Sequence, residues 1–161
     1  MAITKAKKGE IVLKLTEAFK KAASVVFVNF KGLKVSDTTA MRRTLKGEGV
    51  SYTVAKKTLT TRALEDAKFE GERPELEGEL SLAWGEDLVA PAREVYNFVK
   101  KFPENLKILG GIFEGRYMSS AEILSIAQIP SLDMLRGKFV NIINSPIQRL
   151  AIALNEISKK K

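Results

Sequence analysis

An apolar stripe near the end of the chain restricts how this sequence can fold. On a helical wheel at roughly 100° per residue, ten large apolar side chains between residues 132 and 157 share one arc of about 160°. A helix of this length spans roughly 40 Å, whereas a compact body made of residues 1–128 is only about 35 Å across. Each of these side chains would forgo about 1.5–3 kcal/mol if it stayed in water. We therefore expect a long helix that projects from the body and binds another protein.

Pro146 interrupts the predicted terminal helix. A proline inside a helix removes one hydrogen bond and clashes with the preceding turn, which costs about 3 kcal/mol or more. We expect a kink there that separates two sections, each with its own apolar patch, so that the helix can dock two copies of a partner. The predicted partner-binding residues are Leu135, Phe139, Ile142 and Ile143 before the kink, and Ile147, Leu150, Leu154 and Ile157 after it.

Helical and strand patterns alternate through the first 128 residues, which indicates an α+β fold with a mixed sheet of four to five strands and flanking helices. Ser36 to Thr38 and Asp87 are expected to cap two of the helices, and Ser119 with Glu122 forms a capping box for a third. We predict two domains, residues 1–128 and residues 129–161. Helices are predicted over 10–23, 38–47, 58–67, 87–101 and 120–128, and strands over 24–30, 50–55, 80–84, 106–113 and 116–118.

The formal net charge of +8 is unevenly distributed along the chain. Residues 1–62 contain 14 Lys and Arg against 4 Asp and Glu, residues 63–128 contain 7 against 13, and residues 129–161 contain 6 against 2. The three segments therefore carry net charges of +10, −6 and +4. Charge that only keeps a protein soluble is usually interspersed, so a basic first third predicts a surface for a polyanion.

Basic residues of the first third fall into clusters that suit phosphate. Lys7 and Lys8 precede the first predicted helix, and lysines flank Gly32, a residue that allows close backbone approach. Helix starts add free N–H groups, which bind anions. Few aromatic residues accompany these clusters, which favours recognition of a folded RNA through its backbone over stacking of single-stranded bases. The predicted RNA-binding residues are Lys7, Lys8, Lys31, Gly32, Leu33, Arg42, Arg43, Lys46, Lys56, Lys57, Thr58 and Arg62.

Several function classes fit the composition poorly. The chain has no cysteine and no histidine, which removes disulfides, thiolate metal sites and the commonest general base. The acidic residues between 70 and 79 lie in a predicted surface loop without an apolar pocket, and no Walker-type glycine loop is present, so we do not expect an enzyme. No cofactor or metal is expected. Without a signal peptide or an 18-residue apolar run, a soluble cytoplasmic protein is the default.

Short motifs along the whole chain resemble those of the bacterial large-subunit ribosomal protein L-ten family. The first is Phe30-Lys31-Gly32-Leu33-Lys34-Val35, and the second is the helix end from Met41 to Val50. A third, Val54-Ala55-Lys56-Lys57-Thr58-Leu59, follows them. Glu86 to Ala92, Gly110 to Gly115 and Ile129-Pro130-Ser131 come later in the family's order and spacing.

The resemblance implies a ribosomal stalk base. It implies that the N-terminal domain binds large-subunit rRNA beside ribosomal protein L-eleven. It also implies that the C-terminal helix carries dimers of the stalk protein L-seven/L-twelve, which recruit translational GTPases. Two departures are visible. The family's Asn after Lys56 is Lys57 here, and the Pro-Ile-x-x-Leu pattern occurs once, at Pro146 to Leu150, which favours two dimers over three.

The sequence is also compatible with two other functions. A non-ribosomal RNA-binding chaperone or adaptor with an oligomerising C-terminal helix shares the same charge pattern. A membrane-surface protein is the other, because the terminal helix is amphipathic. The polar face of that helix is mostly Asn, Ser and Gln rather than Lys, which fits anionic lipid poorly.

Overall fold

The computed structural model describes residues 5–67, 69–71 and 73–159. The chain divides into two compact units, Met1–Ile129 and Pro130–Lys161. The first is the body, and the second contains one long helix.

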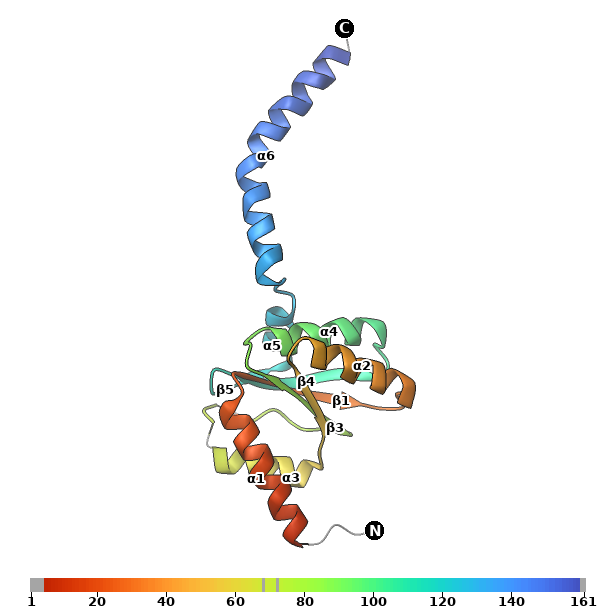
Figure 1. Ribbon diagram of the computed structural model, residues 1–161, viewed down its shortest axis with the longest axis vertical. Helices are drawn as coiled ribbons and strands as arrows, with labels where there is room; N and C mark the ends of the chain where they lie inside the picture. The colour runs from red at the N-terminus through yellow and green to blue at the C-terminus, as the bar shows by residue number, and fades with distance from the viewer. Residues whose placement is uncertain (1–4, 68, 72, 160–161) are drawn as a thin grey trace. The chain divides into compact units, whose positions relative to one another are not determined.

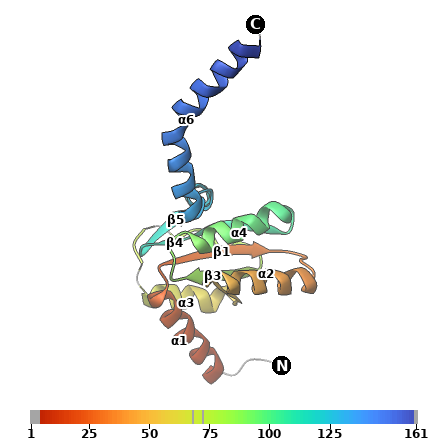
Figure 2. The same cartoon turned by 45° about the horizontal axis from the view of Figure 1, so that its top comes forward.

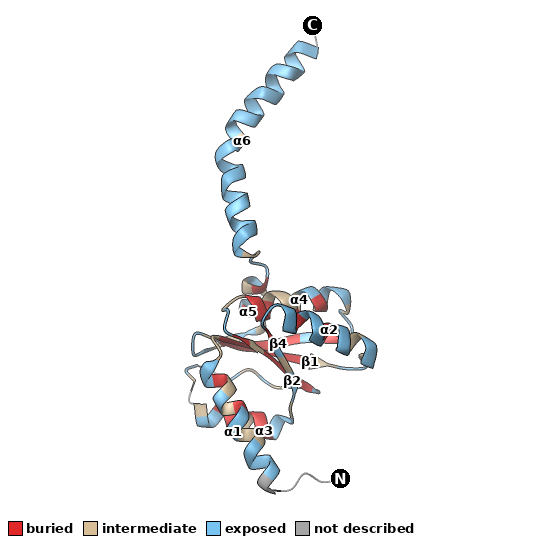
Figure 3. Ribbon diagram, in the orientation of Figure 1, coloured by how far each residue is buried: buried red, intermediate tan, exposed pale blue. Residues whose placement is uncertain are grey.

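The body is built on a five-stranded sheet with the strand order β2-β3-β1-β4-β5. The α+β prediction is confirmed, but the expected mixed sheet is wrong, because each neighbouring pair of these strands is antiparallel. β1 occupies the centre because its residues Val25 to Val28 are apolar and buried on both faces (Figure 3). The strands are β1 (Ser24–Phe30), β2 (Ser51–Val54), β3 (Leu80–Gly85), β4 (Leu106–Phe113) and β5 (Arg116–Ser119).

Helices cover both faces of the sheet and close a separate apolar core on each side. The side chains of α1 (Lys5–Lys21) and α3 (Lys57–Ala67) pack on one face with Phe27 and Leu82 of the strands. The other face is covered by α2 (Val35–Gly47), α4 (Ala90–Lys101) and α5 (Ser120–Ala127), which pack on Val26, Val28 and Leu106. Figure 1 shows these two helical layers on opposite sides of the strands, and Figure 2 shows α4 and α1 on opposite sides of them in a second view.

Some helix boundaries differ from the sequence-based prediction. α1 begins at Lys5 rather than at residue 10, so Lys7 and Lys8 lie on a helix instead of preceding one. The apolar period begins only at Ile11, and residues 7–10 are exposed, so no apolar pattern indicated the first turns of α1. α2 begins at Val35 with Lys34 at its N-cap, and Ser36 to Thr38 are not its cap. Thr38 instead donates a side-chain hydrogen bond back to the Lys34 carbonyl (3.1 Å), as a residue inside a helix does.

Of the two other predicted helix caps, the one at α5 is confirmed and the one at α4 is corrected. The Ser119–Glu122 capping box is present at the start of α5. α4 has Val89 at its N-cap without a side-chain hydrogen bond, so the prediction that Asp87 caps it directly is corrected. Asp87 Oδ1 accepts a hydrogen bond from the Val89 N–H (2.9 Å), which orders the turn that leads into the helix.

The double glycine of β4 does not interrupt the strand. The pairing of β1 with β4 shifts between Phe27 and Val28, which marks a bulge opposite Leu109 and Gly110. A Cβ atom on Gly111 would lie 2.5 Å from the Val25 carbonyl oxygen. Glycine is therefore required because the two backbones approach closely.

The second unit contains α6 (Leu132–Lys159), a helix of 28 residues that includes Pro146. Its ribbon bends part of the way along its length (Figure 1), as expected for an internal proline. None of its residues is buried (Figure 3). In the part of the chain that the structure describes, no helix combines the length and apolar character needed to cross a membrane.

Candidate nucleic-acid interface

Two of the predicted basic segments leave the sheet at the same end. β1 and β2 both run antiparallel to β3, which lies between them, so their last residues lie together. Two backbone hydrogen bonds to the start of β3 fix these exits: Phe30 N–H donates to the Glu79 carbonyl (3.1 Å), and Ala55 N–H donates to the Leu80 carbonyl (3.3 Å). The sheet therefore holds the turn at Lys31 and the segment at Lys56 on one side of the body.

The turn after β1 is fixed by Asn105, a residue that the sequence did not single out. Lys31 N–H donates to the Asn105 carbonyl (2.8 Å), and Asn105 Nδ2 donates to the Lys31 carbonyl (2.7 Å). Gly32 has a φ of +69°, which explains glycine at this position. Leu33 packs partly buried against the core. Its role is to anchor the turn, while the side chains of Lys31 and Lys34 remain exposed.

The structure brings four predicted residues together around a small cleft of about 180 Å³. We call this group, formed by Lys8, Lys56, Thr58 and Arg62, the Lys56 cluster. It joins α1, the loop after β2 and α3, segments that are up to 54 positions apart in the sequence (62 − 8). The four side chains are exposed around the buried Leu59. They can therefore meet an external anion together.

A second group lies on α2, beside the start of β2. Arg42 and Lys46 line a cleft of about 350 Å³ with Tyr52 and Trp84. The Arg42 guanidinium carbon lies 5.8 Å from the centre of the Tyr52 ring, within range of a cation–π contact. Burial raises the pKa of Tyr52 above its ordinary value, although the neighbouring Ser81 hydroxyl and the Arg42 charge oppose this. Tyr52 therefore presents a neutral ring to the Arg42 guanidinium.

The two basic groups flank the edge strand β2. β2 itself is only four residues long, about 10 Å at 3.3 Å per residue. Arg43 and Lys7 are also exposed, but neither lines the clefts of these two groups.

The charge of these residues is not neutralised within the body. In residues 5–67, 69–71 and 73–159, the ion pairs join Arg73 with Glu65, Arg93 with Glu48 and Glu94, and Arg136 with Asp133. None of the predicted RNA-binding cations takes part in them. Exposed cations without an internal partner remain available to phosphates.

An apolar groove of about 540 Å³ lies beside the Lys56 cluster. Phe30, Val54, Ala55 and Leu80 form its apolar part, and Lys56, Lys57, Thr58, Gly78 and Glu79 complete its lining. We call it the Val54 groove, because Val54 is an exposed apolar side chain in it, with 44% of its surface accessible. Sequence reasoning missed this groove, since its residues come from three strands and only their pairing places them together.

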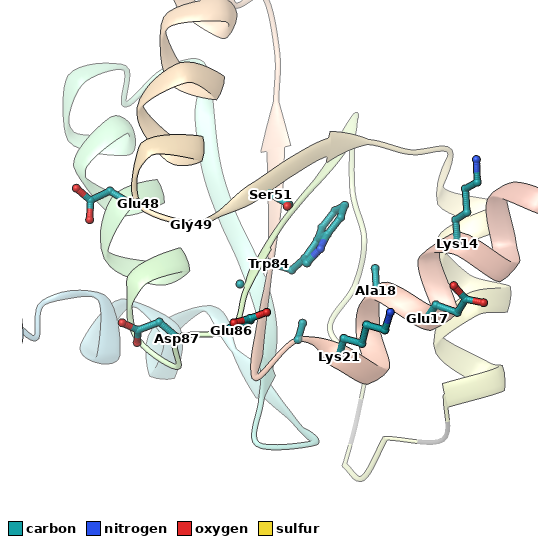
Figure 4. Close-up of a pocket in the computed structure, with 12 residues that line it drawn as sticks. Lys14, Glu17, Ala18, Lys21, Glu48, Gly49, Ser51, Trp84, Glu86 and Asp87 are labelled. Carbon is teal, nitrogen blue, oxygen red and sulfur yellow. The ribbon is translucent and has the colours of Figure 1, made fainter.

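A larger cleft of about 710 Å³ surrounds Trp84. Figure 4 shows its indole between α1, which carries Lys14, Glu17 and Lys21, and the turn from β3 to α4. Glu48, Glu86 and Asp87 also line it, so carboxylates outnumber ammonium groups by four to two. This charge balance disfavours phosphate and marks one limit of the basic surface. In the described residues, no group of three or more His, Cys, Asp or Glu side chains is arranged to hold a metal ion.

The predicted partner-binding residues of α6 are all exposed. Leu135 has 40% of its surface accessible, and the other seven have between 60% and 69%. They occur before and after Pro146, and Ser145 Oγ donates to the Ile142 carbonyl (2.9 Å) next to the proline. α6 therefore presents a long apolar surface to its surroundings.

Comparison with known proteins places these features in one family. A family model described as ribosomal protein L10 matches residues 3–100. A protein of Gluconobacter oxydans named large ribosomal subunit protein uL10 is 39% identical over 137 residues, which cover 85% of this chain and 74% of that protein.

Two further proteins with the same name match almost the whole chain. The protein of Pelotomaculum thermopropionicum is 34% identical over 99% of this chain and 91% of its own length. The protein of Bacillus licheniformis is 32% identical over 94% of this chain and 91% of its own length. These relatives are named as ribosomal proteins, not as enzymes or chaperones. The chain therefore belongs to the ribosomal protein L10 family.

Proposed function

We propose that this protein forms the base of the stalk on the large ribosomal subunit, in the cytoplasm. The body, residues 1–129, binds large-subunit rRNA through the two basic groups that flank β2 and through the Lys31 turn. α6 binds dimers of the stalk protein L-seven/L-twelve. Ribosomal protein L-eleven is the expected neighbour of the body, and the stalk dimers recruit translational GTPases.

The observation that carries the RNA half of this proposal is the convergence of cations for which the described residues provide no ion-pair partner. Lys8, Lys56 and Arg62 come from separate segments and meet at one cleft, and Arg42 with Lys46 extends the positive surface along β2. Membership of the L10 family and the names of the relatives support large-subunit rRNA as the polyanion.

The second part of the proposal, the binding of stalk dimers, rests on the exposed apolar surface of α6. Apolar side chains with 60–69% of their area in contact with water are unfavourable unless a partner covers them. Helices that present such a stripe bind grooves or other helices through their i, i+3 and i+4 positions. Pro146 divides the stripe, which supports two docking sections and therefore two dimers.

A truncation tests whether the body binds rRNA and α6 binds the stalk dimers. Removal of residues 132–161 is expected to leave the affinity for large-subunit rRNA within about twofold, because no residue of the two basic groups is removed. The same truncation should abolish co-purification with stalk dimers. Filter binding measures the first quantity, and size-exclusion chromatography with purified dimers measures the second. Loss of both activities in a body that still folds would contradict the proposal.

A single substitution gives a narrower version of the same test. Leu150→Asp places a charge in the second section of α6, which should reduce the number of bound dimers from two to one, as native mass spectrometry can count. Asn155→Asp, on the opposite polar face of the same section, is the matched control and should retain both dimers. Equal loss in the two variants would argue against docking through the apolar stripe.

A further inference from the structure

We propose that the Val54 groove receives one unpaired nucleobase of the bound RNA. This inference rests on the proposed function, because it assumes that the body binds large-subunit rRNA, and it adds a site that reads a base. A surface that holds only phosphates needs exposed cations and no apolar hollow. Here an apolar hollow of about 540 Å³ opens beside the cations Lys56 and Lys57, and its volume lies in the range of small-ligand sites.

The walls of the groove fit a flat heterocycle. Phe30 is half-buried and Leu80 is buried, so these two side chains form a fixed apolar wall of the groove. Val54 is exposed and forms its open side. The base would lie against these side chains, as bases of single-stranded loops do against apolar and aromatic residues. The hydrogen bonds of Phe30 N–H and Ala55 N–H to the start of β3 make the wall rigid.

The rim of the groove fits the backbone of the same nucleotide. Lys56 and Lys57 line it and are exposed. Leu59 and Thr60 N–H both donate to the Lys56 carbonyl (3.0 Å each), which starts α3 at this point. The first N–H groups of α3 then add to the positive potential. A phosphate next to the inserted base would therefore meet the ammonium groups of Lys56 and Lys57. Because Lys56 also belongs to the Lys56 cluster, this phosphate would remain on the basic surface.

The single acid of the groove indicates which bases it accepts. Glu79 is the only carboxylate among the residues that line it, and its side chain is exposed. A carboxylate accepts hydrogen bonds and repels carbonyl edges, so it pairs with exocyclic amino groups such as N4 of cytosine. We expect the inserted base to carry an exocyclic amino group on its pairing edge, as adenine, cytosine and guanine do and uracil does not; guanine adds its N1–H as a second donor.

The test separates base insertion from phosphate binding. Val54→Gln fills and polarises the groove without a change of charge, and because Val54 is exposed the body should still fold. Its affinity for purified large-subunit rRNA should fall about 5- to 50-fold, in line with the loss of one base contact. The slope of log affinity against log salt should not change, because that slope counts phosphate contacts. Leu13→Gln replaces an exposed apolar residue on α1, outside the groove, and should bind like the wild type.

Chemical probing identifies the base directly. With the wild type, one unpaired base that reacts in the free rRNA, with dimethyl sulfate if it is adenine or cytosine and with kethoxal if it is guanine, should no longer be modified. With Val54→Gln that nucleotide should become reactive again, while the hydroxyl-radical footprint of the backbone persists. If Val54→Gln folds poorly, Val54→Ala widens the groove and should give partial reactivity at the same nucleotide.

The other outcomes are distinguishable. If the wild type does not bind the rRNA, the proposed function itself fails. If the wild type binds but Val54→Gln binds equally well with the same protection, base insertion is excluded while RNA binding stands. A weaker affinity accompanied by a smaller salt slope would also exclude base insertion, because the groove would then act through phosphates.

Discussion

At the residue scale, Gly32 shows how a single backbone angle positions a basic turn. Its φ of +69° is in the left-handed region, and an added Cβ would lie 3.3 Å from Asn105 Nδ2. That amide also holds the Lys31 carbonyl. A side chain at Gly32 would therefore strain the backbone and disturb the hydrogen bond that orients the turn.

We expect Gly32→Ala to lower the free energy of unfolding by about 1–2 kcal/mol, the cost of a left-handed non-glycine residue. Urea unfolding, followed by the fluorescence of Trp84, the only tryptophan, measures this. Gly9→Ala is the control, because Gly9 lies within α1 at a right-handed φ with open space around it. It should raise helix stability by up to about 1 kcal/mol. Equal effects of both substitutions would contradict the role of the angle.

Glu122 makes the stability that the α5 capping box contributes depend on pH. Its carboxylate accepts hydrogen bonds from Ser119 N–H (2.8 Å) and from Ser119 Oγ (2.9 Å). The backbone hydrogen bond first, and the side-chain one second, hold its pKa below the ordinary value of 4.5. A lowered pKa in the folded state means that the carboxylate stabilises the fold above pH 4.5, and that this contribution is lost as the pH falls through the lowered pKa.

Glu122→Gln should therefore reduce the melting temperature at neutral pH and reduce it less at an acidic pH below the lowered pKa, where the wild-type group is itself protonated. Thermal unfolding of both proteins at the two pH values measures the difference. Glu10→Gln, on the exposed start of α1, provides the comparison. A constant difference between wild type and Glu122→Gln at both pH values would show that the charge of Glu122 does not act through the cap.

At the element scale, sequence patterns predicted elements where the apolar period was strong. β1, β4 and α6 were all expected, and the apolar stripe of α6 is exposed along the helix. The first turns of α1 were missed because polar, exposed residues carry no period. The antiparallel pairing was also missed, since the alternation of helices and strands does not fix strand direction. β3 is inserted between β2 and β1, and only long-range pairing determines that order.

Pro146 makes α6 less stable than its length suggests. Pro146→Ala restores one hydrogen bond and removes a clash, which should stabilise the helix by about 3 kcal/mol. Circular dichroism at 222 nm during heating should show the helical signal of the full chain persisting to higher temperature. Ser145→Ala removes only the hydrogen bond to Ile142 and should have a small effect. An unchanged melting profile for Pro146→Ala would mean that the proline does not weaken this helix.

At the scale of the whole molecule, rRNA binding should depend steeply on salt. If the basic surface makes about six to ten phosphate contacts, affinity should fall roughly 10³- to 10⁵-fold between about 50 and 200 mM salt. Lys56→Ala should reduce the slope by about one, because it removes one contact. Lys138→Ala, on α6 outside the body, should leave the slope unchanged. A flat salt titration of the wild type would count against a phosphate-binding surface.

The candidate site could be predicted from the sequence only in part. The basic first third and its clusters follow from composition, and exposure of Lys56, Arg62 and Arg42 agrees with that interpretation, although their contact with RNA stays a prediction. The contribution of Asn105 and the Val54 groove could not be predicted. Each depends on strand ends that meet only after β1 has paired with partners 51 (Asn29 with Leu80) to 89 (Ser24 with Phe113) positions later.

The central position of β1 also has a consequence for synthesis of the protein. β1 is complete at Phe30, but its two neighbours in the sheet end at Gly85 and Phe113. A nascent chain that has released only its basic first third cannot assemble the sheet that gathers the cations. If the basic surface binds rRNA as proposed, the emerging polypeptide cannot present it to the translating ribosome's own RNA until most of the body has left the exit tunnel, so synthesis of the protein and its binding to rRNA are separated in time.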